Sequence, residues 1–194
     1  MNASTLEWTA VAFSLLGVWL MAQRRLWAWP VGLVAVALYA VVFAQARLYS
    51  DALLQLAFAG FLAYGWFNWF GHRRSEGEIR IVPLHKAHAA RDLAIGAVCG
   101  VALGALMHTF TNAALPWLDA MLAAMSLVAQ WWEARRHAAT WWLWIVVDVV
   151  YVGMYASKSL HVTAGLYVVF IALAVMGLRA WTRAAHPHQG TKAA

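Results

Sequence analysis

Seven apolar segments, each long enough to cross a lipid bilayer as a helix, constrain this chain more than any other feature. A spanning helix needs about 20 mostly apolar residues. Of the 194 residues, 64% are hydrophobic and 11% are charged, and the mean hydropathy is +0.64. A soluble domain of this size does not need so much apolar sequence. The sequence therefore predicts an all-α polytopic membrane protein, a single membrane domain over residues 1–194. The predicted spans are 6–23, 28–47, 51–70, 91–111, 117–134, 140–158 and 162–182.

The distribution of basic residues predicts the orientation of the chain. If the N-terminus is outside, only Arg47 and Lys158 fall on the outer side, and the other Lys and Arg of the loops fall inside. Cytoplasmic loops of membrane proteins carry the excess of Lys and Arg. We therefore expect an N-out, C-in topology. The polar stretch 71–90 is predicted to be an exposed loop, and 183–194 a disordered tail.

The chain repeats itself at an offset of 112 residues. Residues 6–69 align with 118–181 without a gap, and the identical pairs include three tryptophan pairs, an arginine and a tyrosine. Repeats of several spans are typical of transporters. We expect two three-helix repeats of the same orientation, 6–70 and 117–182, joined by a linker helix over 91–111. This is a 3+1+3 parallel repeat. The linker carries Gly96, Gly100 and Gly104, a spacing that lets two helices approach closely.

One face of the sixth predicted span carries an acid between aromatic residues. Trp144, Asp148, Tyr151 and Tyr155 are spaced by four, three and four residues, so they share a helix face. A carboxylate near the bilayer centre costs about 2.5–3.5 kcal/mol, so Asp148 should face protein, water or a ligand. Two interpretations remain open. The face binds a small aromatic or cationic solute, or Asp148 is hydrogen-bonded to a neighbouring helix.

The second repeat is more polar than the first at matching positions. The second has Gln130, Trp144 and Asp148 where the first has Val18, Gly32 and Val36. This asymmetry predicts one central site instead of two equivalent ones. Tyr39, the counterpart of Tyr151, is a further candidate.

The third span supplies three more candidate site residues, namely Gln55, Trp66 and Asn68. Most other tryptophans are predicted to lie at the inner membrane surface, where aromatic residues form a belt. The predicted belt residues are Trp27, Trp29, Trp69, Trp131, Trp132, Trp141 and Trp181.

Several function classes lack their sequence signals. There is no Gly-rich phosphate-binding loop, so ATP hydrolysis within this chain is not expected. The histidines have no metal-ligand spacing, and no second acid, His or Ser nucleophile stands near Asp148 for an enzyme site. The basic residues lie in short clusters between apolar segments, which indicates topology and not nucleic-acid binding. We predict no catalytic residue, no metal and no cofactor. A phosphorylated solute would be repelled by Asp148.

Five strings along the chain combine tryptophans with polar residues. They are Trp27-Ala-Trp29-Pro30-Val-Gly32, Leu48-Tyr49-Ser-Asp51-Ala-Leu-Leu-Gln55, Gly65-Trp66-Phe67-Asn68-Trp69, Ala129-Gln130-Trp131 and Trp141-x-x-Trp144-x-x-x-Asp148-x-x-Tyr151. Together they resemble the PnuC-type vitamin transporters, the bacterial carriers of nicotinamide riboside. The resemblance covers nearly the whole chain.

The resemblance implies a seven-helix fold similar to the SWEET sugar transporters, a homotrimer in the bacterial inner membrane, and facilitated diffusion. Uptake of the riboside, a vitamin B3 form and NAD precursor, would be made one-way by a cytoplasmic kinase. Related carriers take thiamine, riboflavin or deoxynucleosides, so these solutes stay open as substrates. A membrane-embedded enzyme and a non-transporting subunit of a larger assembly are rival interpretations. The expected substrate-binding residues are Asp148, Trp144, Tyr151, Gln130, Gln55, Asn68, Trp66 and Tyr39.

Overall fold

The computed structural model describes residues 3–45, 49–111, 115–157, 159 and 161–185, which form seven α-helices and no strand. The helices are α1 (Ala3–Ala22), α2 (Ala28–Gln45), α3 (Tyr49–Glu76), α4 (Lys86–Phe110), α5 (Pro116–Ala134), α6 (Ala139–Ser157) and α7 (His161–Ala185). Five of them, α1, α2, α4, α6 and α7, contain stretches long and apolar enough to cross a membrane. The predicted all-helical chain, with one helix for each apolar segment, is confirmed.

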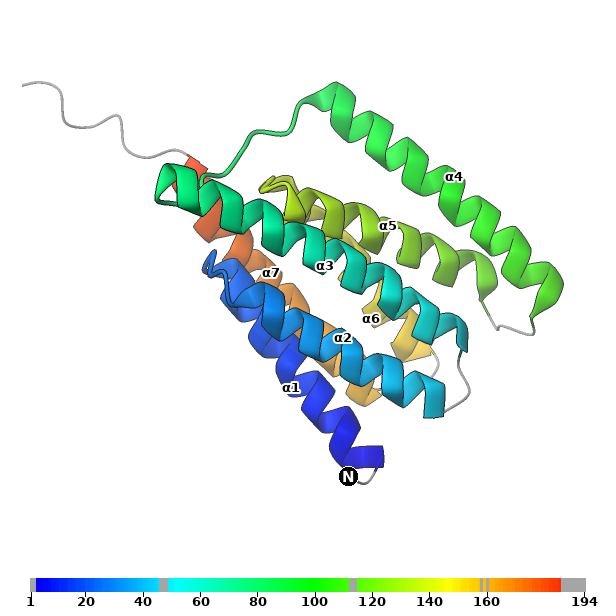
Figure 1. The fold of residues 1–194 in the computed structure, drawn as a ribbon. Helices are drawn as coiled ribbons and strands as arrows, with labels where there is room; N and C mark the ends of the chain where they lie inside the picture. The colour runs from blue at the N-terminus through cyan, green and yellow to red at the C-terminus, as the bar shows by residue number, and fades with distance from the viewer. Residues whose placement is uncertain (1–2, 46–48, 112–114, 158, 160, 186–194) are drawn as a thin grey trace, which may run out of the picture.

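Six of the helices close into a ring, and α4 lies outside it (Figure 1). Within the ring each helix packs against two others, in the order α1, α2, α3, α5, α6, α7 and back to α1. Among the described residues α4 contacts α5 alone. The chain thus forms two sets of three consecutive helices, and the contacts of α3 with α5 and of α7 with α1 join them. A solute site between the two sets would lie inside this ring.

Four tryptophans fill one end of the ring, and we call them the tryptophan quartet: Trp29 of α2, Trp69 of α3, Trp141 of α6 and Trp181 of α7. Their exposed fractions are between 0% and 1%. The ring centroids of successive members lie 5.2, 5.6 and 5.4 Å apart, in the order Trp29, Trp69, Trp181, Trp141. The prediction of an interfacial belt is therefore wrong for these four residues. Apolar surroundings suit a tryptophan at a membrane surface and in a core alike, and only the packing distinguishes the two.

Two hydrogen bonds tie the helix sets together at the quartet. The indole Nε1 of Trp69 donates to the carbonyl oxygen of Ala134 at 3.2 Å, and Nε1 of Trp181 donates to that of Met21 at 3.1 Å. Each bond runs from one three-helix set to the last turn of a helix in the other. Carbonyl oxygens in a last helical turn lack a partner within the helix. Besides the indoles, the Met21 carbonyl accepts from the Arg24 N–H at 2.8 Å, and the Ala134 carbonyl accepts from Asn68 Nδ2 at 2.8 Å.

Local features of the first helix set recur 112 residues later in the second. In each set a quartet indole lies directly on a glycine of the following helix, and an arginine with positive φ ends the first helix. The pairs are Trp29 on Gly65 and Trp141 on Gly177, and Arg24 and Arg136 with φ of 57° and 66°. Positive φ is uncommon for a residue other than glycine, so its recurrence at matching positions indicates that both turns follow the same backbone course.

The stretch predicted as an exposed loop, 71–90, is mostly exposed, but the loop itself is shorter than expected because helices cover both of its ends. Helix α3 continues through Gly71 to Glu76 and ends at Gly77, whose φ of 77° suits the residue after a helix. Helix α4 begins at Lys86, after the side chain of His85 accepts a hydrogen bond from the Ala87 N–H. We call residues 77–85 the linking segment. Residues 183–185, predicted as part of the tail, belong to α7, and the remainder of the tail, 186–194, lies outside the described residues.

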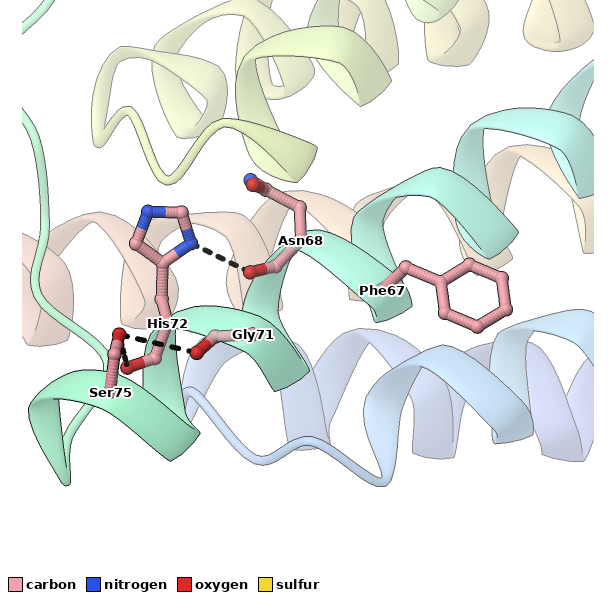
Figure 2. A pocket seen from close by; sticks show the side chains of 5 residues that line it. All are labelled: Phe67, Asn68, Gly71, His72 and Ser75. Carbon is pink, nitrogen blue, oxygen red and sulfur yellow. Dashed lines mark hydrogen bonds between the residues drawn. The ribbon is translucent and has the colours of Figure 1, made fainter.

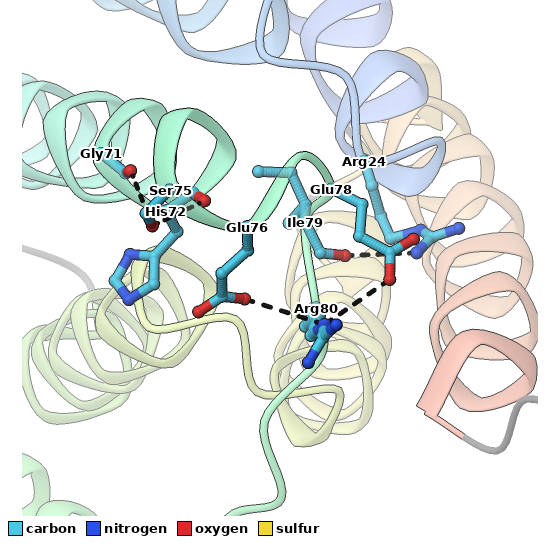
Figure 3. A network of polar contacts seen from close by, with 8 residues as sticks. All are labelled: Arg24, Gly71, His72, Ser75, Glu76, Glu78, Ile79 and Arg80. Atoms are coloured by element: carbon cyan, nitrogen blue, oxygen red, sulfur yellow. Dashed lines mark hydrogen bonds and ion pairs between the residues drawn. The ribbon is translucent and has the colours of Figure 1, made fainter.

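The linking segment is fastened to both helix sets. Ile79 is 6% exposed and belongs to the core cluster around the quartet. Arg24 Nη1 donates to the Ile79 carbonyl oxygen at 3.3 Å (Figure 3). On the other set, the Val82 N–H donates to the Arg136 carbonyl at 3.0 Å, and His137 Nδ1 contacts the Val82 carbonyl at 2.9 Å. The segment therefore crosses the α1–α2 and α5–α6 turns.

Helix α4 packs closely on α5 through its glycines, as the spacing predicted. A Cβ atom at Gly96 would lie 2.7 Å from the Val128 side chain, and one at Gly100 would lie 2.9 Å from Met121. Asp92 strengthens this contact, since its Oδ2 atom accepts a hydrogen bond from Trp132 Nε1 at 3.0 Å. The predicted close approach of α4 to another helix is confirmed.

Candidate functional site

The side chain of Asp148 points into the helix ring. Thr140 of α6 faces α5, since its hydroxyl donates to the Ala129 carbonyl at 2.8 Å, and Trp141 faces α7. At 100° per residue Asp148 lies between these two directions, roughly opposite the exposed Val146. Asp148 is 6% exposed. Among the described residues none donates a hydrogen bond to its carboxyl group or forms an ion pair with it.

Three tyrosines form a cluster beginning one helical turn from Asp148. The rings of Tyr151 and Tyr155, both on α6, have centroids 5.8 Å apart. Tyr167 of α7 lies 4.7 Å from Tyr151 and 5.3 Å from Tyr155. The sequence reasoning did not single out Tyr167, although it stands 112 residues after the candidate Gln55. That offset is the signal that would have found it.

Two residues of α5 continue the polar surface. Ser126 lies next to the phenol of Tyr151, and Gln130, which is 6% exposed, lies one turn further along α5. Gln130 Nε2 donates to Oε2 of Glu133 at 2.9 Å. Glu133, 7% exposed, was missed in the sequence, where an acid next to the α5–α6 turn was indistinguishable from a surface residue.

The faces of α5 show where these side chains point. Met121 and Val128 face α4, Trp131 contacts α3, and Ala129 faces α6. At 100° per residue, Ser126, Gln130 and Glu133 fall in the sector between the α3 and α6 directions. That sector faces the interior of the ring. The predicted residues Gln130, Asp148 and Tyr151 therefore lie on interior faces of two packed helices.

Trp144 lies on the same face of α6 as Asp148 and Tyr151. Its side chain is half-buried and packs against the core cluster that contains the quartet. Four of the eight predicted residues, Gln130, Trp144, Asp148 and Tyr151, are thus gathered in the second helix set.

Asn68 of α3 occupies a different position. Its Nδ2 atom donates to the Ala134 carbonyl at 2.8 Å, beside the indole of Trp69. Asn68 also lines an open hollow of about 210 Å³ with Phe67, Gly71, His72 and Ser75. Figure 2 shows Asn68 and His72 directed toward the α5–α6 region and Phe67 directed away from it. The amide N–H group of Asn68 therefore serves the packing of α3 on α5, and its oxygen is left for other partners.

The other three predicted residues have no contact with Asp148 among those described. Trp66 is 38% exposed, with its ring stacked on Phe67 at 6.3 Å. Tyr39 stacks on Phe43 with ring centroids 5.7 Å apart and lies near Ser14, in the first helix set. Gln55 is half-buried on α3. Tyr39 and Ser14 mirror Tyr151 and Ser126 at the 112-residue offset.

The gathered residues of α5 and α6 offer a carboxyl group, an amide and aromatic faces inside a ring of helices. Within the part of the chain that the structure describes, no group of three His, Cys, Asp or Glu side chains is placed to hold a metal ion.

Comparison with known proteins identifies the family. Residues 4–183 match the family described as nicotinamide mononucleotide transporter. The chain belongs to this family. The predicted membership of the PnuC-type transporters is confirmed, and the chain is a multi-pass membrane transporter, not an enzyme.

Individual relatives agree. The nicotinamide riboside transporter PnuC of Escherichia coli (strain K12) is 27% identical over 223 residues, covering 99% of this chain and 90% of that protein. The riboflavin/roseoflavin transporter RibM of Streptomyces davaonensis is 26% identical over 181 residues, covering 90% of this chain and 84% of the relative. The crystal structure of the vitamin B3 transporter PnuC superimposes with a TM-score of 0.78 at 24% identity, over 96% of this chain and 84% of that one. This last similarity concerns the fold.

Proposed function

We propose that this transporter takes up nicotinamide riboside. The observation that carries the proposal is the buried carboxyl group of Asp148, which has no described cationic partner and lies beside aromatic rings. A buried charge is costly unless it is paired. The fixed positive charge of a pyridinium ring would supply the missing partner, and aromatic faces attract such cations.

The remaining candidate residues would orient the solute. Trp144 and Tyr151 would flank the pyridinium ring, while the amide of Gln130 would pair with the carboxamide or the ribose hydroxyls. Gln55, Asn68, Trp66 and Tyr39 stay in the proposal as residues that contact the solute when the helix sets move. That movement is a rocking of the two sets about a site near mid-membrane.

The proposal includes the membrane architecture. All seven helices span the membrane, N-out and C-in, as two parallel three-helix repeats joined by α4, with the fold of SWEET transporters and a homotrimeric assembly. The recurrence of the Trp–Gly contacts and of the arginine turns at the 112-residue offset supports the repeat. So does the closed ring of α1–α3 and α5–α7.

The proposal also covers the energetics of uptake. The resemblance to the PnuC-type carriers implies facilitated diffusion across the bacterial inner membrane, and the sequence has no nucleotide-binding loop for ATP-driven transport. A cytoplasmic kinase would trap the riboside as its phosphate. Asp148 would disfavour return of the phosphorylated product, because like charges repel in a medium of low dielectric.

A second candidate is another vitamin or nucleoside. Thiamine is also a cationic aromatic, and the relative RibM is a riboflavin/roseoflavin transporter. Riboflavin differs from the other two solutes in having no fixed positive charge. Thiamine and nicotinamide riboside are both cations, so charge does not distinguish between them.

Calorimetric binding to the purified, detergent-solubilised protein tests the proposal. We expect saturable binding of nicotinamide riboside that nicotinamide mononucleotide does not displace. Asp148→Asn should weaken binding about 10- to 100-fold, the equivalent of the roughly 1.5–3 kcal/mol of an interaction with a charged group. Asp148→Val is the matched second variant, because Val36 occupies the corresponding position of the first repeat. Binding of thiamine alone would show that thiamine, and not nicotinamide riboside, is the substrate. Unchanged riboside affinity in both variants would show that Asp148 does not contact the solute.

A further inference from the structure

Glu133 is a buried acid that the proposed function does not yet use. It follows Ser126 and Gln130 at spacings of seven and three residues, on the face of α5 that points into the helix ring. The first helix set has Met21 at the position of Glu133 and Val18 at that of Gln130. The acid and the amide therefore occur together in one half of the molecule and are both absent from the other.

Glu133 does not serve stability in any evident way. Its described side-chain partner is the amide of Gln130. Arg136 lies one turn further on, but its Nε atom is buried without a described partner, and no described ion pair joins it to Glu133. Removing an acid from water is costly when no cation compensates it. A methionine such as Met21 would fill this position without that cost, so the acid has another role.

The contact with Glu133 sets the orientation of the Gln130 amide. A glutamine amide has an NH₂ group that donates and a carbonyl oxygen that accepts. Because Nε2 is directed at Glu133 Oε2 at 2.9 Å, the carbonyl Oε1 on the other arm of the planar amide is directed away from Glu133. Among the described residues none donates to Oε1. The interior face of α5 therefore presents an acceptor at Gln130, and the neighbouring helix α6 carries the carboxyl group of Asp148.

We infer that Glu133 is a specificity-determining positioning residue that holds the Gln130 amide with its carbonyl oxygen toward the solute. The site then favours a cationic solute that carries an N–H or O–H donor, and rejects one that presents a carboxylate at the same place. A site built to hydrogen-bond one group discriminates strongly against an analogue without it, because its buried polar groups are left unpaired. The inference rests on the proposed function, since it assumes that Gln130 contacts the solute.

Two variants separate positioning from charge. Glu133→Met introduces the residue of the first helix set and frees the Gln130 amide to rotate. Glu133→Gln removes the charge and keeps an oxygen that accepts from Nε2. The probes are nicotinamide riboside, whose carboxamide carries an N–H donor, and nicotinic acid riboside, whose carboxylate does not.

We expect wild-type protein and Glu133→Gln to prefer nicotinamide riboside by similar factors, within about 3-fold of each other. Glu133→Met should lower that preference about 10-fold, mainly by admitting nicotinic acid riboside, with the melting temperature unchanged or raised. An equal loss of preference in both variants would overturn the inference, because charge would then be the cause. An equal fall in affinity for both solutes, with a lowered melting temperature, would show a structural role only.

A measurement without any solute keeps this test separate from the proposed function. The chain has five glutamines, so side-chain amide resonances of glutamine-labelled protein in detergent are few, and Gln130→Val identifies that of Gln130. We expect Glu133→Met to shift this resonance, and Glu133→Gln to leave it near its wild-type position. A resonance unaffected by Glu133→Met would overturn the inference. Failure of the wild-type protein to bind either riboside would instead count against the proposed function alone.

Discussion

Substituting Gly177 with alanine tests how tightly the tryptophan quartet is packed. A Cβ atom at this position of α7 would lie 2.5 Å from both Cε2 and Cζ2 of Trp141, whereas ordinary contacts are 3.4–4 Å. The indole would have to retreat by about 1 Å to reach ordinary contact distance. Its retreat is hindered because Trp181 packs against it, with ring centroids 5.4 Å apart and planes at 87°.

The expected loss of stability follows from two opposing terms. Overpacking a well-packed core costs about 1–3 kcal/mol. Alanine in place of a helical glycine stabilises the helix by up to about 1 kcal/mol. We therefore expect a net destabilisation of about 1–2 kcal/mol, or about 2–8 °C in melting temperature for a chain of this size.

The matched control is Gly165→Ala on the same helix, where an added Cβ atom would meet no other atom within 4 Å. Thermal unfolding of both variants in the same detergent, followed by tryptophan fluorescence, gives the comparison. Gly165→Ala should melt at or above the wild-type temperature. Combining Gly177→Ala with Trp141→Phe should cost less than the sum of the single changes, since the two residues are in contact. A Gly177→Ala protein as stable as Gly165→Ala would refute the argument from packing.

Two further predictions concern the linking segment. Ile79→Ala should lower the free energy of unfolding by about 2–4 kcal/mol because it leaves a cavity beside the quartet. Arg80→Ala, which removes a side chain that is 67% exposed, should lower it by less than about 1 kcal/mol. Equal melting temperatures would contradict the buried position of Ile79. Burial lowers the pKa of His137 below its usual 6.5, so the unfolded chain binds the proton more readily than the folded protein. The contribution of His137 to stability is therefore complete above pH 6.5 and is lost as the pH falls through the lowered pKa. His137→Asn keeps a side-chain donor for the Val82 carbonyl without titrating, so it should lose less stability than wild type between pH 7 and pH 5, and parallel melting curves in that range would count against the prediction.

Helical periodicity decides which residues share a face, and it predicted the shared face of Trp144, Asp148 and Tyr151 from the sequence. The structure turns this face and Gln130 toward the inside of the helix ring, and their contact with a solute stays a prediction. Glu133 was not predicted as an interior residue because an acid at a helix end has the same sequence pattern whether it is buried or exposed. Asn68 was predicted as a solute contact, but nothing in its spacing indicated that the Ala134 carbonyl would take its N–H group.

The sequence by itself determined the seven helices, the polar face around Asp148 and the 112-residue correspondence, since apolar length and periodicity are local properties of the chain. Only the tertiary structure decided that Trp29, Trp69, Trp141 and Trp181 meet in one core instead of facing lipid. The physical reason is that lipid and protein interior are both apolar, so hydropathy does not distinguish them. Which helix faces which is settled by close packing and by a few hydrogen bonds between helices, such as that from Trp69 to Ala134.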